Sequence, residues 1–274
     1  MKKRKITPGG LIYACAAGIW LITTIFPLYF AILSSFKDDQ TIFADFFALP
    51  QRFGLDNYIS AEKMVHILRA TANSLLLSAG SICLMLGVSI MGAYVTARKR
   101  IPGSEGVTLF LIAAMMIPIQ SAIVPIVQMV SAIGQRNNLF VLMIIYAGIN
   151  LSMVFFILKG YIEGIPKELD EAAKIDGASG VQSTRYIALP LLKSTHTTVI
   201  ILGIVGTLKT FDIVWLITQG GPARKTEMLT TMLYRSYILE YKAGYAAAIA
   251  VVILIIALVL SCINLYFQRK DTDY

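Results

Sequence analysis

Six long apolar stretches decide what this 274-residue chain can fold into. A helix that crosses a bilayer needs about 20 mainly apolar residues, because each residue adds only about 1.5 Å of length. Only 15% of the residues are charged, against roughly 25% in a soluble domain, so much of the surface faces lipid. We therefore predict an all-α, polytopic membrane protein with six transmembrane helices, forming a single domain over residues 1–274. The expected spans are 11–35, 73–96, 107–131, 139–159, 195–217 and 243–267.

The first apolar stretch follows a basic N-terminus, as the apolar region of a secretory signal peptide would. It is longer than the roughly 7–15 residues of such a region, and no small-residue cleavage site follows it. We therefore expect it to be retained as a helix. The three cysteines lie inside apolar stretches and the two histidines stand apart, so the sequence predicts neither a disulfide nor a metal site.

The placement of lysine and arginine predicts the orientation in the membrane. Six spans put the N-terminus, the connections after the second and fourth spans, and the C-terminal tail on one side, where 14 of the 24 Lys and Arg residues lie. Such an excess is typical of cytoplasmic segments. We therefore expect a multi-pass protein of the cell membrane, surrounded by lipid, with both termini in the cytoplasm. The basic clusters adjoin the spans, which favours this topological role over binding of nucleic acid.

A polar segment, residues 160–194, separates the fourth and fifth stretches on the predicted cytoplasmic side. Pro166 suits the first turn of a helix, and three acids near the start favour the positive end of the helix dipole. Gly177 suits the left-handed end of the same helix. A second short helix is predicted over 179–188, ending before Pro190.

The first of these helices has only about ten residues, too few to be stable alone in water. Its narrow apolar side consists of small residues flanked by acids. Helices that lie on a membrane surface instead prefer Lys or Arg with Trp, Phe or Leu. We interpret the helix as a docking element for a cytoplasmic partner, with an interfacial amphipathic helix as the alternative.

The segment also carries a motif with fixed spacing, which resembles the EAA motif of permease subunits in ABC importers that depend on a solute-binding protein. The motif reads Glu171-Ala172-Ala173, Gly177 and Ile187-Ala188-Leu189-Pro190. Four other segments are similar to the sugar-permease branch of that family, and the resemblance covers about residues 10–270. These segments are FKDDQTIF after the first span, LDNY at 55–58, NS at 73–74 and GGPARKTEMLTTMLY at 220–234.

The resemblance implies a type I ABC importer permease fold in which residues 160–194 form the coupling loop. It implies three partners: a dimer of cytoplasmic ATPase subunits, a second permease subunit in a heterodimer, and an extracellular binding protein that delivers a sugar. ATP would be used by the ATPase, and this chain, which has no G-x-x-x-x-G-K-[ST] phosphate loop, would bind no cofactor. The docking residues that it implies are Glu171, Ala172, Ala173, Gly177, Ile187, Leu189 and Pro190.

These docking residues have different expected roles. Glu171 would make a charged contact with a basic group of the ATPase. Ala172 and Ala173 would be buried against the ATPase. Gly177 would set the geometry of the turn that ends the helix.

Polar and aromatic side chains inside the spans are candidates for the sugar path, because planar hydrogen-bonding groups and aromatic faces recognise sugars. The candidates are Gln120, Tyr146, Asn150 and Trp215. Polar groups at membrane depth usually face a bundle interior, so Gln120 and Asn150 have the alternative role of joining helices. Tyr146 and Trp215 have the alternative role of packing or of lying in the interfacial aromatic belt.

Several other functions remain as alternatives. Within the same family, the chain could instead be a permease for a polyol, glycerol phosphate or another polar solute. A secondary transporter usually carries inverted repeats and an ion site, and no clear repeat or mid-span acid is found here. A membrane enzyme needs a nucleophile–base pair or a ligand cluster, and none is visible. Lys209 and Asp212, near the end of the fifth stretch, are interpreted as an interfacial local ion pair.

Overall fold

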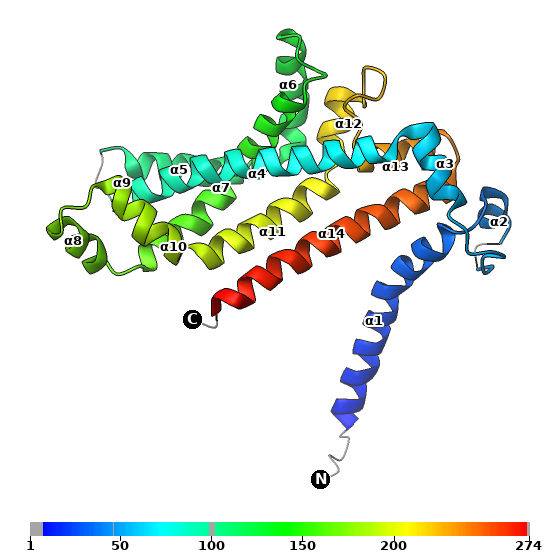
Figure 1. The fold of residues 1–274 in the computed structure, drawn as a ribbon, viewed down its shortest axis with the longest axis horizontal. Coiled ribbons are helices and arrows are strands. Elements are labelled where there is room, and N and C mark those ends of the chain that lie inside the picture. Colours follow the sequence, from blue (N-terminus) through cyan, green and yellow to red (C-terminus); the bar gives the residue numbers. More distant parts are fainter. Residues whose placement is uncertain (1–7, 46, 99–101, 273–274) are drawn as a thin grey trace. The chain divides into compact units, whose positions relative to one another are not determined.

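The computed structural model describes residues 8–45, 47–98 and 102–272, which form helices and no strands (Figure 1). Two compact units make up the chain: Met1–Ile67 with Met232–Leu254, and Leu68–Thr231 with Ile255–Tyr274. Two short π-type turns, Thr184–Ala188 and Arg235–Leu239, lie between helices. The helices are α1 Pro8–Ser34, α2 Asp39–Ala44, α3 Asp56–Val65, α4 Ile67–Arg98, α5 Ser104–Met115, α6 Ile119–Ala132, α7 Leu139–Gly164, α8 Glu168–Ile175, α9 Gly180–Ser183, α10 Leu189–Leu191, α11 Lys193–Lys209, α12 Asp212–Thr218, α13 Leu229–Tyr234 and α14 Ala243–Thr272.

Four of the described helices, α1, α4, α7 and α14, are each long and apolar enough to cross a membrane. Two further pairs of helices pass the same test together but are bent, so the number of spans reaches six if each pair counts as one. The expected all-α, six-span architecture is thus confirmed, while two of the six spans differ in form from the expected straight helices.

The third expected span, 107–131, is not one helix. α5 and α6 meet at an angle of 100°, and Pro118 stands between them with an extended backbone (φ −62°, ψ 130°). Proline removes a backbone donor and disfavours helical geometry in the residue before it, so the helix breaks there. At the start of α6 the Pro118 carbonyl accepts from both the N–H and the hydroxyl of Ser121, at 3.0 and 2.7 Å.

The fifth expected span, 195–217, is also interrupted. α11 ends at Lys209, the backbone of Thr210 is extended (ψ 126°), and α12 begins at Asp212. The Thr210 hydroxyl donates to the Gly206 carbonyl at 2.7 Å, a local bond that competes with helix continuation. Asp212 then lies in the first turn of α12, where the helix dipole favours an acid. Before α11, residues 184–191 form the other arm of a 66° bend.

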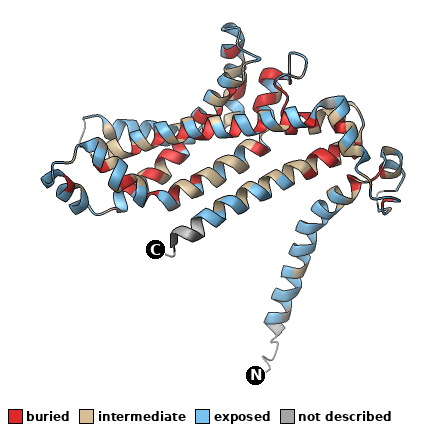
Figure 2. Cartoon of the chain, viewed as in Figure 1, coloured by how far each residue is buried: buried red, intermediate tan, exposed pale blue. Residues whose placement is uncertain are grey.

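The unit built from α1 to α3 and residues 232–254 is joined by polar contacts beyond the end of α1. The Asn57 side-chain amide donates to the Ser35 and Lys37 carbonyls at 2.9 and 2.8 Å, and Asp39 accepts from the Gly244 N–H at 2.8 Å. A Cβ on Gly244 would lie 2.8 Å from the Lys37 carbonyl oxygen, so only glycine permits this approach. In the apolar part of α1 that could cross a membrane, no residue is buried (Figure 2).

The other unit has two apolar clusters along α4, α6, α7, α11 and α12. One contains Phe155 and Leu158 of α7, packed against Ile82 and Met85 of α4 and Val199 of α11. The second lies between α6, α7 and α12 and includes Leu142 and Val214, both fully buried. These clusters account for the buried faces of α4, α7 and α11 in Figure 2. α7 contributes to both clusters and is the central helix of this unit.

Candidate functional site

The candidate coupling helix is α8, Glu168–Ile175, which follows the end of α7. Its three acids stand in the first turn, where the helix dipole favours negative charge. The helix starts two residues after Pro166; Lys167 precedes it with helical angles (φ −70°, ψ −23°), and its carbonyl accepts from the Glu171 N–H at 3.1 Å. It therefore has eight residues instead of about ten.

α8 ends at Gly177 in the predicted left-handed conformation, with φ +80°. The Ala178 N–H donates to the Ala173 carbonyl at 2.8 Å, and the Gly177 N–H donates to the Lys174 carbonyl at 3.1 Å. These two bonds form a Schellman cap, which satisfies carbonyls at the helix end. A Cβ on Gly177 would have nothing within 4 Å, so the backbone conformation, and not a lack of space, requires glycine.

The two alanines of the motif lie on different sides of α8. Ala172 is exposed beside Glu171, whereas Ala173 is only 8% exposed and already packs within this chain. Leu169 and Ile175, at 41% and 87% exposure, lie on the same side as Ala172. The surface that α8 offers is therefore made of Leu169, Glu171, Ala172 and Ile175, which we call the α8 face. Ala173 supports this face from behind instead of forming part of it.

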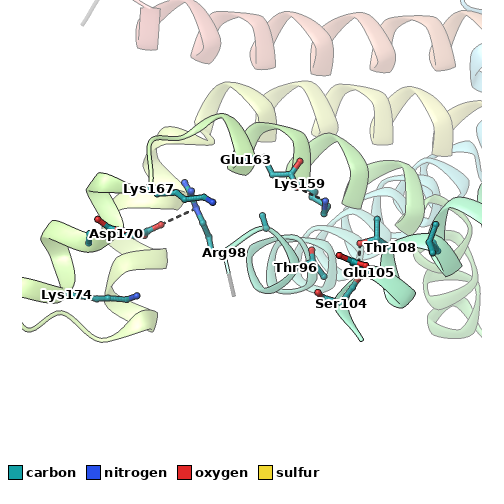
Figure 3. Close-up of a pocket in the computed structure, with 13 residues that line it drawn as sticks. Thr96, Arg98, Ser104, Glu105, Thr108, Lys159, Glu163, Lys167, Asp170 and Lys174 are labelled. Atoms are coloured by element: carbon teal, nitrogen blue, oxygen red, sulfur yellow. Dashed lines mark hydrogen bonds and ion pairs between the residues drawn. The ribbon is translucent and has the colours of Figure 1, made fainter. Parts of the chain in front are cut away.

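The inner side of α8 is held by polar contacts, of which Figure 3 shows the pair between Arg98 and Asp170. Arg98, the last residue of α4, places its Nε 3.1 Å from Asp170 Oδ2 and donates from Nη2 to the Ile165 carbonyl at 2.8 Å. The Ser183 hydroxyl donates to the other Asp170 oxygen. In the sequence, Arg98 belongs to the basic residues that predict orientation, and Asp170 is one of the three acids near the start of the polar segment. Their pairing joins residues 72 positions apart, which no local pattern reveals.

The second half of the motif differs from its predicted form. The segment expected as one helix over 179–188 is α9, then the π-type turn 184–188, then α10, which contains Pro190. The helical path does not end before Pro190, because Pro190 stands in the first turn of α10, where its missing N–H is not needed. Ile187 and Leu189 are half-buried, and Pro190 is exposed.

A groove of 630 Å³ runs beside α8, between α4, α5 and α7 (Figure 3). Its lining has four basic and four acidic side chains, so its charges are balanced. Lys159 and Glu163, one turn apart on α7, form an ion pair at 2.6 Å on one wall. The charged residues are Arg98, Lys159, Lys167, Lys174, Glu105, Glu163, Asp170 and Glu171.

A second cavity, of 130 Å³, lies between α4, α7 and α11 and brings together two of the four predicted sugar-path residues. Tyr146 and Asn150, one turn apart on α7, line it beside Ser81 of α4 and Thr207 of α11. The Asn150 amide nitrogen donates to the Tyr146 carbonyl at 2.9 Å. Ser81 and Thr207 were not predicted to line the path, because single hydroxyl residues are common in apolar spans.

The other two sugar-path candidates lie elsewhere. Gln120 is exposed near the start of α6, and Trp215 of α12 stacks on Phe211 with ring centroids 5.7 Å apart. Neither lines the 130 Å³ cavity. The expected ion pair between Lys209 and Asp212 is not formed in the described part of the chain. Both side chains are exposed, Lys209 at the end of α11 and Asp212 at the start of α12.

Comparison with known sequences gives a family match and a relative. The family model described as "Binding-protein-dependent transport system inner membrane component" matches residues 86–271. These residues include α8, the α7 walls of the groove and of the 130 Å³ cavity, and the α11 wall of that cavity. The chain is 30% identical over 222 residues to the probable starch degradation products transport system permease protein AmyC of Thermoanaerobacterium thermosulfurigenes. The match covers 80% of each chain.

Comparison with solved structures gives the same fold. A bacterial ABC transporter involved in the import of the acidic polysaccharide alginate matches with a TM-score of 0.81 and 17% identity, covering 96% of this chain and 97% of that one. A bacterial alginate ABC transporter, in complex with a periplasmic protein bound to an alginate pentasaccharide, matches with a TM-score of 0.73 and 21% identity. That match covers 95% of this chain and 94% of the other.

Proposed function

This chain belongs to the family of binding-protein-dependent transport system inner membrane components, and from that premise we propose that α8 is the surface through which a cytoplasmic ATPase drives it. The chain is a multi-pass membrane protein and a sugar-permease subunit of an ABC importer. The fold is that of importer permeases, which confirms the expectation from the EAA motif. The family that the chain belongs to is one of transport components.

The α8 face is the observation that carries the proposal. It presents two large apolar side chains, a small alanine and the Glu171 carboxylate to the outside, on a helix fixed from behind by Arg98. A small residue between larger ones lets another surface approach closely, and a carboxylate at the rim suits a basic group on that surface. Because the sequence has no phosphate loop, the ATP would be bound and hydrolysed by the partner.

The orientation of the chain and its partners in the transporter follow from the same proposal. α8 faces the cytoplasm, both termini lie on that side, and a dimer of ATPase subunits holds α8 and its counterpart on a second permease subunit. The permease pair is a heterodimer, and an extracellular binding protein delivers the sugar to its outer mouth. Closure of the ATPases on ATP moves the coupling loops and switches the access of the path between the two sides.

The 130 Å³ cavity is our proposal for the part of this chain that contacts the sugar. Its wall combines the Asn150 amide with the hydroxyl side chains of Ser81 and Thr207, groups that exchange hydrogen bonds with sugar hydroxyls. Its lining contains no Lys, Arg or His, so a phosphate group would find no cation there. The cavity therefore favours a neutral sugar over glycerol phosphate.

Transport by the reconstituted complex tests the assignment. The permease pair, the ATPase and the binding protein are placed in proteoliposomes, and uptake of labelled maltotriose and of an alginate oligosaccharide is followed with and without ATP. Ala172→Arg, which adds bulk to the α8 face, is expected to abolish co-purification of the ATPase and uptake. Gln182→Arg, exposed on α9 in the same loop, is the matched control and should retain both.

Two results would contradict the proposal. One is full ATP-driven uptake by the Ala172→Arg variant. The other is modification of Lys174→Cys by a membrane-impermeant maleimide from outside intact cells, which would put α8 on the wrong side of the membrane.

A further inference from the structure

We propose that Arg98 is the positioning residue that makes α4 move together with the coupling helix α8. The inference rests on the proposed function of α8 and adds the route by which motion enters the membrane. Arg98 would act through its ion pair with Asp170 and would touch neither ATP nor sugar.

α8 has little apolar burial of its own to fix its orientation. Of its eight residues only Ala173 is buried, and an alanine side chain contributes little burial energy. A rigid link to the bundle therefore has to come from polar contacts. Asp170 supplies them, because one carboxylate oxygen meets Arg98 and the other accepts from Ser183.

Arg98 is suited to be a rigid link because of its shape and its surroundings. Its side chain is only 7% exposed, and Nη2 of its planar guanidinium donates to the Ile165 carbonyl at the end of α7. Nε lies 3.1 Å from Asp170 of α8 as an ion pair without a hydrogen bond. The hydrogen bond to α7 fixes the plane of the guanidinium and so places its charge against Asp170, which a single flexible ammonium group does less well. The charge is shielded from water, so the pair is weakened little by salt.

The other end of the link lies at the sugar-path cavity. α4 runs from Ile67 to Arg98 without a break, roughly 48 Å at about 1.5 Å per residue. Ser81 and Met85 of the same helix line the 130 Å³ cavity. A displacement of α8 that pulls Arg98 therefore reaches the cavity wall through one continuous helix, whereas α5 and α6, beyond the next loop, are separated by the bend at Pro118.

The Lys159–Glu163 pair provides a matched comparison in the same groove. It has the same kind of charges at 2.6 Å, but both residues belong to α7 and are one turn apart. A pair within one helix cannot transmit motion between elements. Removing it should leave coupling intact, while removing Arg98 should not.

The test uses the assembled complex of this chain, its permease partner and the ATPase in nanodiscs, with the native cysteines replaced by serine. Ser81→Cys introduces a single cysteine into the cavity. The rate at which a water-soluble maleimide modifies this cysteine is measured with and without ATP and vanadate. In the complex that carries Ser81→Cys with Arg98 intact, which we call the parent, ATP and vanadate should change the labelling rate by about fivefold or more, a factor typical of allosteric coupling. With Arg98→Met added, the change should fall below about twofold.

Assembly and ATP hydrolysis separate a positioning role from a merely structural one. The Arg98→Met complex should still co-purify with the ATPase and hydrolyse ATP, while Arg98→Lys, which keeps the charge but not the planar guanidinium, should give an intermediate labelling change. Lys159→Met should keep the full change. An undiminished change in Arg98→Met, an equal loss in Lys159→Met, or a parallel loss of assembly would overturn the inference. If the parent itself shows no ATP-dependent change, the proposed function fails and takes the inference with it.

Discussion

The coupling loop and the helical bundle of the larger unit are stabilised in opposite ways. In α8 one alanine is buried, and the helix is fixed by a Schellman cap at Gly177 and by Arg98 on Asp170. In the bundle, α7 alone buries Leu142, Phe155 and other large apolar side chains against α4, α11 and α12. The bundle therefore resists change through packing, whereas the loop depends on a few directional contacts.

The difference fits the two tasks proposed above. A helix that transmits force has to keep a defined direction while its outer face stays free for a partner, and polar contacts on the inner side provide that. A bundle that opens and closes a path needs close packing with few polar groups exposed to lipid, since unsatisfied polar groups there are costly. Mutations should therefore act on stability in the bundle and on coupling in the loop.

The strongest challenge to this comparison is Phe155→Ala in the bundle. Phe155 is 2% exposed, packs edge-to-face on Phe156 with ring centroids 5.6 Å apart, and lies in the cluster shared by α4 and α7. The cavity left behind should destabilise the protein by about 3–5 kcal/mol. Unfolding by SDS in mild detergent measures this loss. Ile144→Ala, at a half-exposed position of the same helix, is the control and should change stability far less.

A smaller effect is expected where α11 approaches α4. A Cβ on Gly203 would lie 2.7 Å from Ile82 Cγ1, whereas a Cβ on Gly206 would have nothing within 4 Å. Gly203→Ala should therefore destabilise the bundle by about 1–3 kcal/mol through overpacking. Gly206→Ala should be neutral or stabilising, because alanine is the better helix former. The same SDS unfolding assay compares them.

A double variant sharpens that prediction. Ile82→Ala removes the atom that the new Cβ would meet, so Gly203→Ala should be far less harmful in that background. Equal losses in the Gly203 and Gly206 variants would show that helix contact is not what requires glycine at position 203.

Much of this architecture was predictable from local sequence, and the exceptions share a physical cause. Long apolar runs predicted the six spans, and the glycine at position 177 predicted the left-handed end of α8. The breaks at Pro118 and Thr210 were missed because composition identifies apolar length, while a single residue decides where the backbone turns. Pro118 was visible in the sequence, but a proline in a span often produces only a kink.

The candidate site was harder to predict, because its parts come together only in three dimensions. Tyr146 and Asn150 share a cavity because they are one turn apart on a predicted helix, and this spacing can be seen in the sequence. Ser81 and Thr207 join them from two other helices through packing alone. Gln120 is exposed just after the break at Pro118, and Trp215 stacks on Phe211 just after the break at Thr210. Neither break was predicted, so neither placement was.

The smallest effect on stability, with the clearest effect on coupling, is expected from Gly177→Ala. The position has φ +80° with open space around it, so alanine pays no steric penalty with neighbours and only the strain of left-handed geometry, about 1–2 kcal/mol. The strain falls on a cap outside the packed bundle, so SDS unfolding should be nearly unchanged. ATP-driven uptake should fall, because the frayed end of α8 no longer holds the α8 face in place.

Two variants are controls for this prediction. Gly177→Asn, which tolerates the same geometry, should lose less uptake, and Gly160→Ala, inside α7 with equal free space, should lose none. If Gly177→Ala lowers the unfolding midpoint as much as Gly203→Ala while uptake by the remaining folded protein is normal, the loop is part of the packed core and the contrast between the two regions is wrong.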